Sequence, residues 1–188
     1  SRTGDVITAE ALLEETKEKA RGKITNEEFS PEERESVAEA VAVGAIKYAI
    51  LRQASGKDII FDFEQSLSFE GDSGPYLQYT LARTCSLLSK AKDQPIDPLA
   101  MQGDEVIPLH KHLLRFPEVV LRAEQERAPH VVATYLVELA REFNAFYGNT
   151  VVLNGSADEP YKLALVALTA EVLARGLTVL GIPTPDRM

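Results

Sequence analysis

Prolines stand at the start of most apolar segments of this chain, and this placement restricts the fold more than any other feature of the sequence. A proline fits the first turn of a helix, where its missing N–H is not needed, but it disrupts a helix interior or a central strand. Several segments open on or beside a proline and continue with apolar residues three and four positions apart. We expect helices at 31–53, from about 75 onward, and at 108–115, 117–126, 129–147 and 159–174. A further helix over 9–21 follows the capping residue Thr8. The pattern predicts an all-α helical bundle, with a short extended segment near the N-terminus at residues 57–63.

The helix that begins near Pro75 follows an unusual turn. Gly71 and Gly74 permit backbone angles that other residues avoid, and Asp72 or Ser73 can cap the exposed N–H groups of a helix. We therefore expect a hinge at this point, followed at once by a long helix.

Two different faces of that helix carry side chains of different kinds. Helical spacing places one set on an apolar face: Leu77, Leu81, Cys85 and Leu88. Tyr76, Tyr79 and Arg83 fall together on another face. Phenol rings stack on unpaired bases and a guanidinium pairs with phosphate, so this second face is a candidate surface for single-stranded RNA.

A purely structural role also accounts for the tyrosine face. Tyrosines on helices are commonly half-buried at the edge of a core, and Arg83 has Glu70 and Asp72 nearby in sequence as possible partners. Spacing alone favours this structural interpretation over nucleic-acid binding.

Charge and reactive side chains exclude several function classes. A net charge of −9 argues against binding nucleic acid through bulk electrostatics, although a local binding face is compatible with it. The single cysteine, Cys85, is expected to be a core residue, and His110, His112 and His130 lack the spacing of metal ligands and are expected at the surface or at caps. No segment has the length of a membrane span or the pattern of a signal peptide, so we expect a cytoplasmic protein that binds no membrane.

Three separated motifs resemble the C-terminal part of class I arginyl-tRNA synthetases. The segment Gly71-Asp72-Ser73-Gly74-Pro75-Tyr76-Leu77-Gln78-Tyr79, followed by Ala82-Arg83, is similar to the family signature Gly-Asp-Thr-Gly-Pro-Tyr-Leu-Gln-Tyr. Upstream, Val43 to Tyr48 and Phe61-Asp62-Phe63 are similar to the segment that precedes the signature. The C-terminal stretch from Val172 to Met188 resembles the end of a DALR-type anticodon-binding domain.

The resemblance implies a division of the chain and a site. Residues 1–72 would be the end of the catalytic region with its connecting helices, and residues 73–188 the DALR-type anticodon-binding domain. The implied partner is tRNA-Arg and not DNA. The residues implied to contact the anticodon stem and loop are Tyr76, Tyr79, Arg83, Tyr147 and Met188. Aromatic and thioether surfaces can hold splayed bases without an overall basic protein.

The sequence also departs from the family pattern. Lys162-Leu163 stands where the family tends to have Arg-Leu, which keeps the charge but not the planar fork. Ser1 and Arg2 resemble only the end of the Lys-Met-Ser-Lys-Ser-type loop that contacts ATP phosphates, and the His-Ile-Gly-His-type motif is missing. The resemblance implies a parent enzyme that uses arginine and ATP with magnesium. The present chain is then a fragment with no catalytic residue, cofactor or metal site of its own.

Two other functions remain open from the sequence. One is a helical protein-interaction scaffold that retains the fold without binding tRNA. The other is a complete enzyme, which only acidic pairs such as Glu14-Glu15 and Glu27-Glu28 suggest. Solvated helix faces explain these pairs better than acid–base catalysis does.

Overall fold

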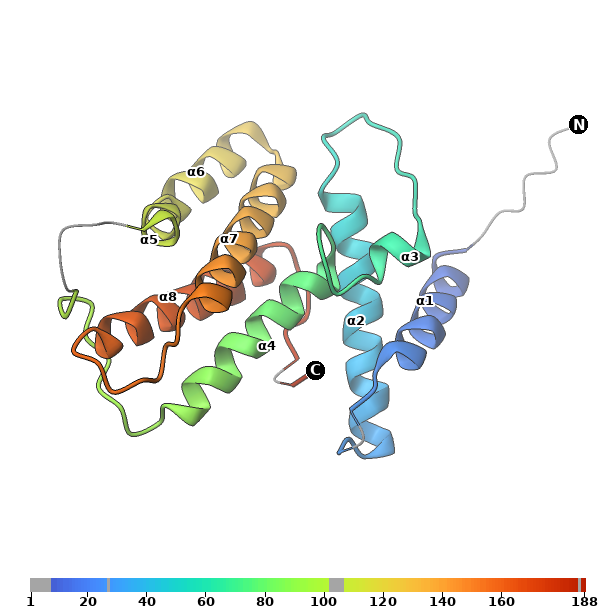
Figure 1. The fold of residues 1–188 in the computed structure, drawn as a ribbon. Helices are drawn as coiled ribbons and strands as arrows, with labels where there is room; N and C mark the ends of the chain where they lie inside the picture. The colour runs from blue at the N-terminus through green and yellow to red at the C-terminus, as the bar shows by residue number, and fades with distance from the viewer. Residues whose placement is uncertain (1–7, 27, 102–106, 186) are drawn as a thin grey trace, which may run out of the picture.

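The structure is a computed structural model that describes residues 8–26, 28–101, 107–185 and 187–188. In these ranges the chain forms eight α-helices and no strand, which confirms the all-α prediction (Figure 1). The helices are α1 (Ala9–Lys23), α2 (Pro31–Leu51), α3 (Phe63–Ser66), α4 (Gly74–Lys90), α5 (Pro108–Leu113), α6 (Phe116–Glu126), α7 (Pro129–Asn149) and α8 (Glu159–Val179). Residues 58–62, in the segment expected to be extended, have no regular secondary structure and lead into α3.

Helix starts follow the local signals of the sequence. The Thr8 hydroxyl accepts the Ala11 N–H at 3.1 Å, and α2 begins with a complete capping box between Ser30 and Glu33. Ser73, rather than Asp72, caps α4, because its hydroxyl accepts the Tyr76 N–H at 3.0 Å. These side chains satisfy N–H groups that have no partner within the helix itself.

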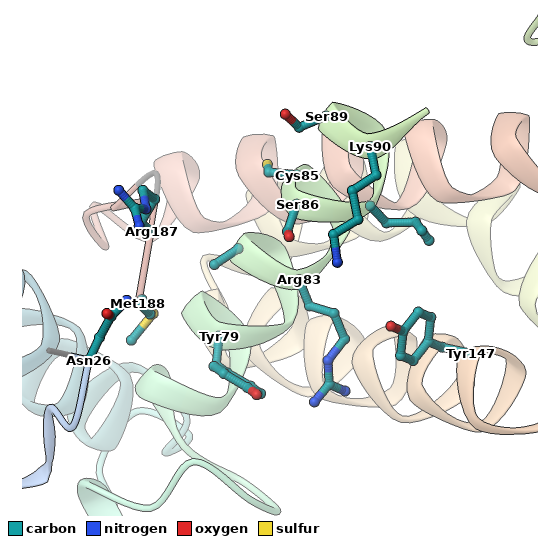
Figure 2. A pocket seen from close by; sticks show the side chains of 12 residues that line it. Asn26, Tyr79, Arg83, Cys85, Ser86, Ser89, Lys90, Tyr147, Arg187 and Met188 are labelled. Atoms are coloured by element: carbon teal, nitrogen blue, oxygen red, sulfur yellow. The ribbon is translucent and has the colours of Figure 1, made fainter. Parts of the chain in front are cut away.

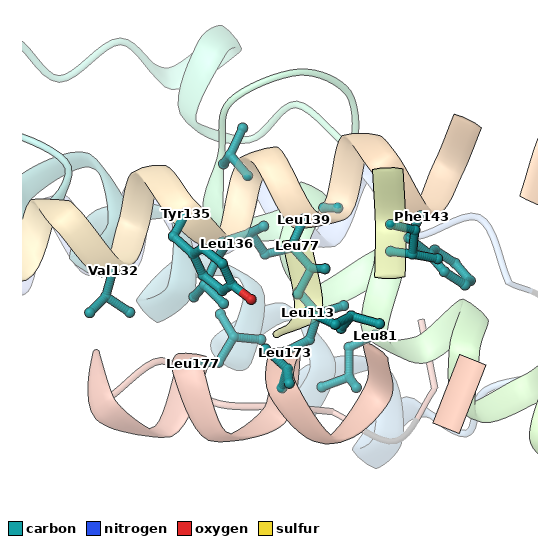
Figure 3. Packing of buried hydrophobic residues seen from close by; sticks show 14 of the residues in the cluster. Leu77, Leu81, Leu113, Val132, Tyr135, Leu136, Leu139, Phe143, Leu173 and Leu177 are labelled. Carbon is teal, nitrogen blue, oxygen red and sulfur yellow. The ribbon is translucent and has the colours of Figure 1, made fainter. Parts of the chain in front are cut away.

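Two groups of buried side chains hold the helices together. The smaller group joins α1, α2 and the turn after α3 and includes Ala20, Val41 and Leu67. The larger group joins α4 to the helices α5–α8, with Leu77 and Leu136 fully buried among its members (Figure 3). In Figure 1, α4 lies between α1–α3 on one side and α5–α8 on the other. The position of α4 therefore determines how these two parts of the chain meet.

The residues after α8 dock between α2 and α4 rather than extending into solvent. Ile182 is buried, the Pro183 carbonyl accepts an N–H of the Gln78 side chain at 2.7 Å, and Lys47 donates to the Gly181 carbonyl. Met188 packs against the smaller buried group, close to α1 and α2.

Several side chains differ in place from the sequence-based expectation. Cys85 is exposed, not a core residue, because α4 turns that side toward open space. The histidines of α5 pack between helices instead of lying at the surface: His112 stacks on Tyr135 with 4.6 Å between ring centroids, and His110 contacts the Tyr161 hydroxyl at 3.1 Å.

Two helices also run further than expected. Helix α7 continues through Gly148 to Asn149, and α8 continues through Gly176 to Val179. Gly176 lies against Leu136, where a Cβ atom would overlap the leucine side chain. Packing therefore explains this glycine, and it does not end the helix. Across the described ranges, no helix is long and apolar enough to cross a bilayer.

Candidate nucleic-acid interface

An open hollow of about 650 Å³ lies along one side of α4 (Figure 2). Its walls come from four parts of the chain: α4, the end of α7, the loop after α1 and the C-terminal residues. The lining residues are Asn26, Tyr79, Ala82, Arg83, Cys85, Ser86, Leu87, Ser89, Lys90, Tyr147, Arg187 and Met188. Four of the five residues implied by the resemblance line this hollow, namely Tyr79, Arg83, Tyr147 and Met188.

An arginine lies between two half-exposed tyrosine rings. The Arg83 guanidinium carbon is 4.8 Å from the centroid of the Tyr79 ring and 5.4 Å from that of Tyr147. Tyr79 is 37% exposed and Tyr147 is 40% exposed, so both rings keep free surface for a further contact. Phe69 supports Tyr79 edge-on at 6.0 Å, and Phe143 stacks against Tyr147 at 6.0 Å. Figure 2 shows Arg83 between the two rings.

Tyr76 has a different environment from Tyr79. It is 9% exposed and does not line the hollow. Its hydroxyl accepts the Asn144 amide N–H at 3.0 Å, and the same amide nitrogen lies 3.2 Å from the Thr80 hydroxyl oxygen. The Asn144 side-chain oxygen accepts an N–H of Arg83. Tyr76 is therefore joined to the hollow through Asn144 and does not form part of its surface.

Glu70 and Asp72, the possible partners of Arg83 suggested by the sequence, do not pair with it. Asp72 pairs with Arg52 at 2.9 Å and accepts the Tyr48 hydroxyl. Burial, together with this bond to Asp72, raises the pKa of Tyr48 well above its ordinary range. Within the described part of the chain, Arg83 has no carboxylate within 4.0 Å, and the same holds for Lys90.

The hollow is locally basic although the chain carries a net charge of −9. Arg83, Lys90 and Arg187 contribute cationic groups, and no Asp or Glu among the residues that the structure describes lines it. Arg187 also pairs with Glu28 at 2.7 Å, where both side chains are exposed. A surface of this composition attracts phosphate, and its tyrosine rings provide stacking faces.

A second hollow of about 350 Å³ adjoins the first and shares Asn26, Tyr79 and Met188 with it. Its other walls include Lys23 from the end of α1 and Phe69 from the turn before α4. Tyr79 thus lines both hollows. Arg34 holds the loop after α1, which lines both hollows, by donating to the Ile24 and Asn26 carbonyls at 2.6 and 2.8 Å.

Sequence reasoning missed Asn26, Lys90, Asn144 and Arg187. Two local signals were available: Asn144 stands three positions before Tyr147 and so shares its side of α7, and Lys90 stands seven positions after Arg83 and so shares its side of α4. Asn26 and Arg187 join the hollow through tertiary packing.

The remaining residues singled out from the sequence lie elsewhere. Lys162 is in the first turn of α8, pairs with Asp158 at 3.0 Å, and does not line the hollow. The Ser156 hydroxyl and Lys162 hold the pKa of Asp158 below its ordinary value of 3.8. Ser1 and Arg2 lie outside the described residues.

Residues 77–188 of the sequence match the family described as "DALR anticodon binding domain". The chain belongs to this family. Residues 1–63 of the same chain match a second family, described as "tRNA synthetases class I (R), catalytic domain". The two matches confirm the resemblance predicted from the separated motifs.

Curated relatives of this DALR chain are named arginine–tRNA ligases. That of Serratia proteamaculans is 38% identical over all of this chain and 34% of its own length, and that of Methanocorpusculum labreanum is 38% identical over all of this chain and 35% of its own length. Among solved structures, the Thermus thermophilus arginyl-tRNA synthetase superposes on 99% of the chain with a TM-score of 0.88 and 35% identity, which takes in 33% of that protein. The chain thus spans about a third of the length of the relatives it matches.

Proposed function

We propose that this chain is the anticodon-binding part of an arginine–tRNA ligase and holds the anticodon stem and loop of tRNA-Arg against the hollow beside α4. One observation carries the proposal: Arg83 lies between the half-exposed rings of Tyr79 and Tyr147, in a basic hollow that Met188 also lines. The description of the matched family and the names of the curated relatives support it.

Each lining residue has a separate role in this proposal. Tyr79 and Tyr147 stack on unpaired bases. Arg83, which lies between the two rings, donates charge-assisted hydrogen bonds to the RNA. Met188 contributes a polarisable apolar contact. Tyr76, implied by the resemblance to contact RNA, acts from behind this surface through Asn144.

The proposal extends to the parent enzyme. Residues 1–72 would end its catalytic region and residues 73–188 would form the anticodon-binding domain, with Ser1 and Arg2 at the end of the loop that contacts ATP. The parent would join arginine to tRNA-Arg in the cytoplasm with ATP and magnesium. We propose that the present chain alone does not activate arginine, and ATP–pyrophosphate exchange assayed with this chain tests that statement.

A binding titration tests the central proposal. The 188-residue chain should bind tRNA-Arg and protect its anticodon loop from nucleases. Tyr79→Ala should weaken binding by about 1–3 kcal/mol, the usual loss for one stacking side chain. Tyr79→Phe is the matched control, because it keeps the ring and should bind almost as well as the wild type. A folded Tyr79→Ala variant that binds tRNA-Arg as tightly as the wild type would contradict the proposal.

A helical protein-interaction scaffold is the second candidate function. An open apolar groove of about 400 Å³ between α6 and α8 favours it, with Phe116, Val120 and Val179 among its walls. As a scaffold, the chain would not bind tRNA-Arg, and the two Tyr79 variants would be indistinguishable from the wild type in the titration.

A further inference from the structure

The side chain of Asn144 occupies a distinctive place next to the hollow. It projects from α7 toward α4 and makes three hydrogen-bond contacts there, with Tyr76, Thr80 and Arg83. Tyr76 and Thr80 are buried, and the Thr80 hydroxyl is itself anchored because it donates to the Tyr76 carbonyl at 2.8 Å. Asn144 is therefore held by the hydroxyl groups of two buried residues.

The chemistry of the partners fixes the orientation of the Asn144 amide. A guanidinium can only donate hydrogen bonds, so the amide oxygen must face Arg83. The amide NH₂ then faces the two hydroxyl oxygens. One terminal nitrogen of Arg83 is thus hydrogen-bonded to the Asn144 side-chain oxygen. The contacts with the Tyr79 and Tyr147 rings restrict the orientation of the guanidinium group.

We infer that Asn144 is a positioning residue for RNA binding: it holds the Arg83 guanidinium between the two tyrosine rings without neutralising its charge. The inference rests on the proposed function and extends it to a residue that does not line the hollow. An unrestrained arginine would lose more conformational entropy on binding RNA, so restraint before binding favours affinity.

The neutrality of Asn144 is as important as its position. The chain has 29 acidic side chains. Of those that the structure describes, none lines the hollow and none pairs with Arg83. An aspartate at position 144 would also accept from Arg83, but it would form an ion pair and could not donate to Tyr76 and Thr80. An asparagine thus gives a hydrogen bond while the positive charge stays available for phosphate.

Titrations of the 188-residue chain with tRNA-Arg test the inference through a double-mutant cycle. Arg83→Ala should weaken binding about tenfold or more, the loss typical of a specific arginine contact. Asn144→Ala should weaken it about fivefold, but should have no further effect in the Arg83→Ala background, because Asn144 acts through Arg83. Asn149→Ala is the matched control on α7, since the Asn149 side chain donates to the Ala145 carbonyl of its own helix and to no other described residue.

Asn144→Asp separates position from charge. This variant should keep Arg83 restrained, yet bind tRNA-Arg at least fivefold more weakly and with a smaller dependence of affinity on salt concentration. Asn149→Asp adds the same charge further along α7 and should change both quantities much less. Nitrogen-15 relaxation of the Arg83 Nε–H group without RNA should show increased motion in Asn144→Ala but not in Asn144→Asp.

The outcomes distinguish this inference from the proposed function. If Arg83→Ala binds tRNA-Arg as tightly as the wild type, the proposed function is wrong and the inference falls with it. If Arg83→Ala is weakened while Asn144→Ala is not, or if the two losses simply add, the proposed function stands and the positioning role of Asn144 is overturned. Wild-type affinity in Asn144→Asp would likewise overturn the role assigned to its neutrality.

Discussion

Gly44 and Gly74 meet where α2 passes α4, so closely that a Cβ atom on Gly74 would overlap the Gly44 carbonyl oxygen. A Cβ atom on Gly44 would in turn lie 2.7 Å from the side-chain amide of Gln78. That amide donates to the carbonyls of Ala40 on α2 and Pro183 in the C-terminal segment. The contact between the two glycines thus allows one buried glutamine to join both halves of the chain and the segment that ends at Met188.

Gly74→Ala should destabilise the chain by about 1–3 kcal/mol, the usual cost of overpacking, because both sides of the contact are backbone and cannot move aside. Gly148→Ala is the control. Gly148 lies in α7 with nothing near its missing Cβ, so alanine there should stabilise the fold by about 0.5–1 kcal/mol. Urea denaturation of both variants measures these changes in the free energy of unfolding. Equal stability of the two variants would show that α2 and α4 are not in tight contact.

Lys90→Gln should reduce the dependence of RNA affinity on salt. Lys90 lines the hollow and has no carboxylate partner among the described residues, so it is free to neutralise a phosphate. Loss of one such contact to a single-stranded loop should lower the slope of log affinity against log salt concentration by about 0.7. Lys19→Gln removes the same charge from α1, where Lys19 pairs with Glu15 at 3.5 Å, and should leave the slope unchanged. Equal effects of the two variants would mean that net charge, not the hollow, governs binding.

Tyr76→Phe should lower the free energy of unfolding but leave the RNA affinity almost unchanged. Removing the buried hydroxyl deletes one of the acceptors of Asn144 and should cost about 1 kcal/mol in the free energy of unfolding. RNA affinity should change by less than about twofold, because Thr80 still accepts from Asn144 and the ring is not in the hollow. Parallel unfolding and tRNA titrations check both values. A large loss of affinity with unchanged stability would instead indicate that Tyr76 contacts RNA itself.

Asp158→Asn should destabilise the start of α8 at neutral pH but not in acid. The Ser156 hydroxyl and Lys162 lower the pKa of Asp158 in the folded chain, so its charged form is favoured by folding. This stabilisation is complete above the unfolded pKa near 3.8 and is lost as pH falls through the lower folded pKa. The pair is partly exposed, so the variant should lose about 0.3–1 kcal/mol at pH 7. Melting temperatures of both proteins should differ at neutral pH and converge as the pH is lowered below the folded pKa, and a constant difference would contradict this account.

The helices could be predicted because their signals are local. A proline in the first turn, a capping hydroxyl and apolar spacing over a few turns predict where α2 or α4 begins, and the structure confirms both starts. Helix ends depend more on packing. Gly176 lies inside α8 and against Leu136, forty residues earlier in sequence, and no local pattern reports such a contact.

The hollow was only partly predictable for the same reason. Tyr79 and Arg83 are one turn apart, so their shared face follows from helical geometry, whereas their grouping with Tyr147 and Met188 came from the family resemblance. Arg83 meets Asn144 across 61 positions of sequence. From the sequence neighbourhood alone, Asp72 is a possible partner of Arg83. In the folded chain, however, Asp72 pairs with Arg52.

The placement of Tyr79 and Tyr147 gives the chain an optical reporter of its own. The sequence contains six tyrosines and no tryptophan, so its intrinsic ultraviolet emission comes from phenol rings alone. Two of these rings border the hollow, one on each side of the Arg83 guanidinium. A molecule that stacks there should quench part of this emission, and occupancy of the hollow can then be followed by fluorescence without attaching a dye.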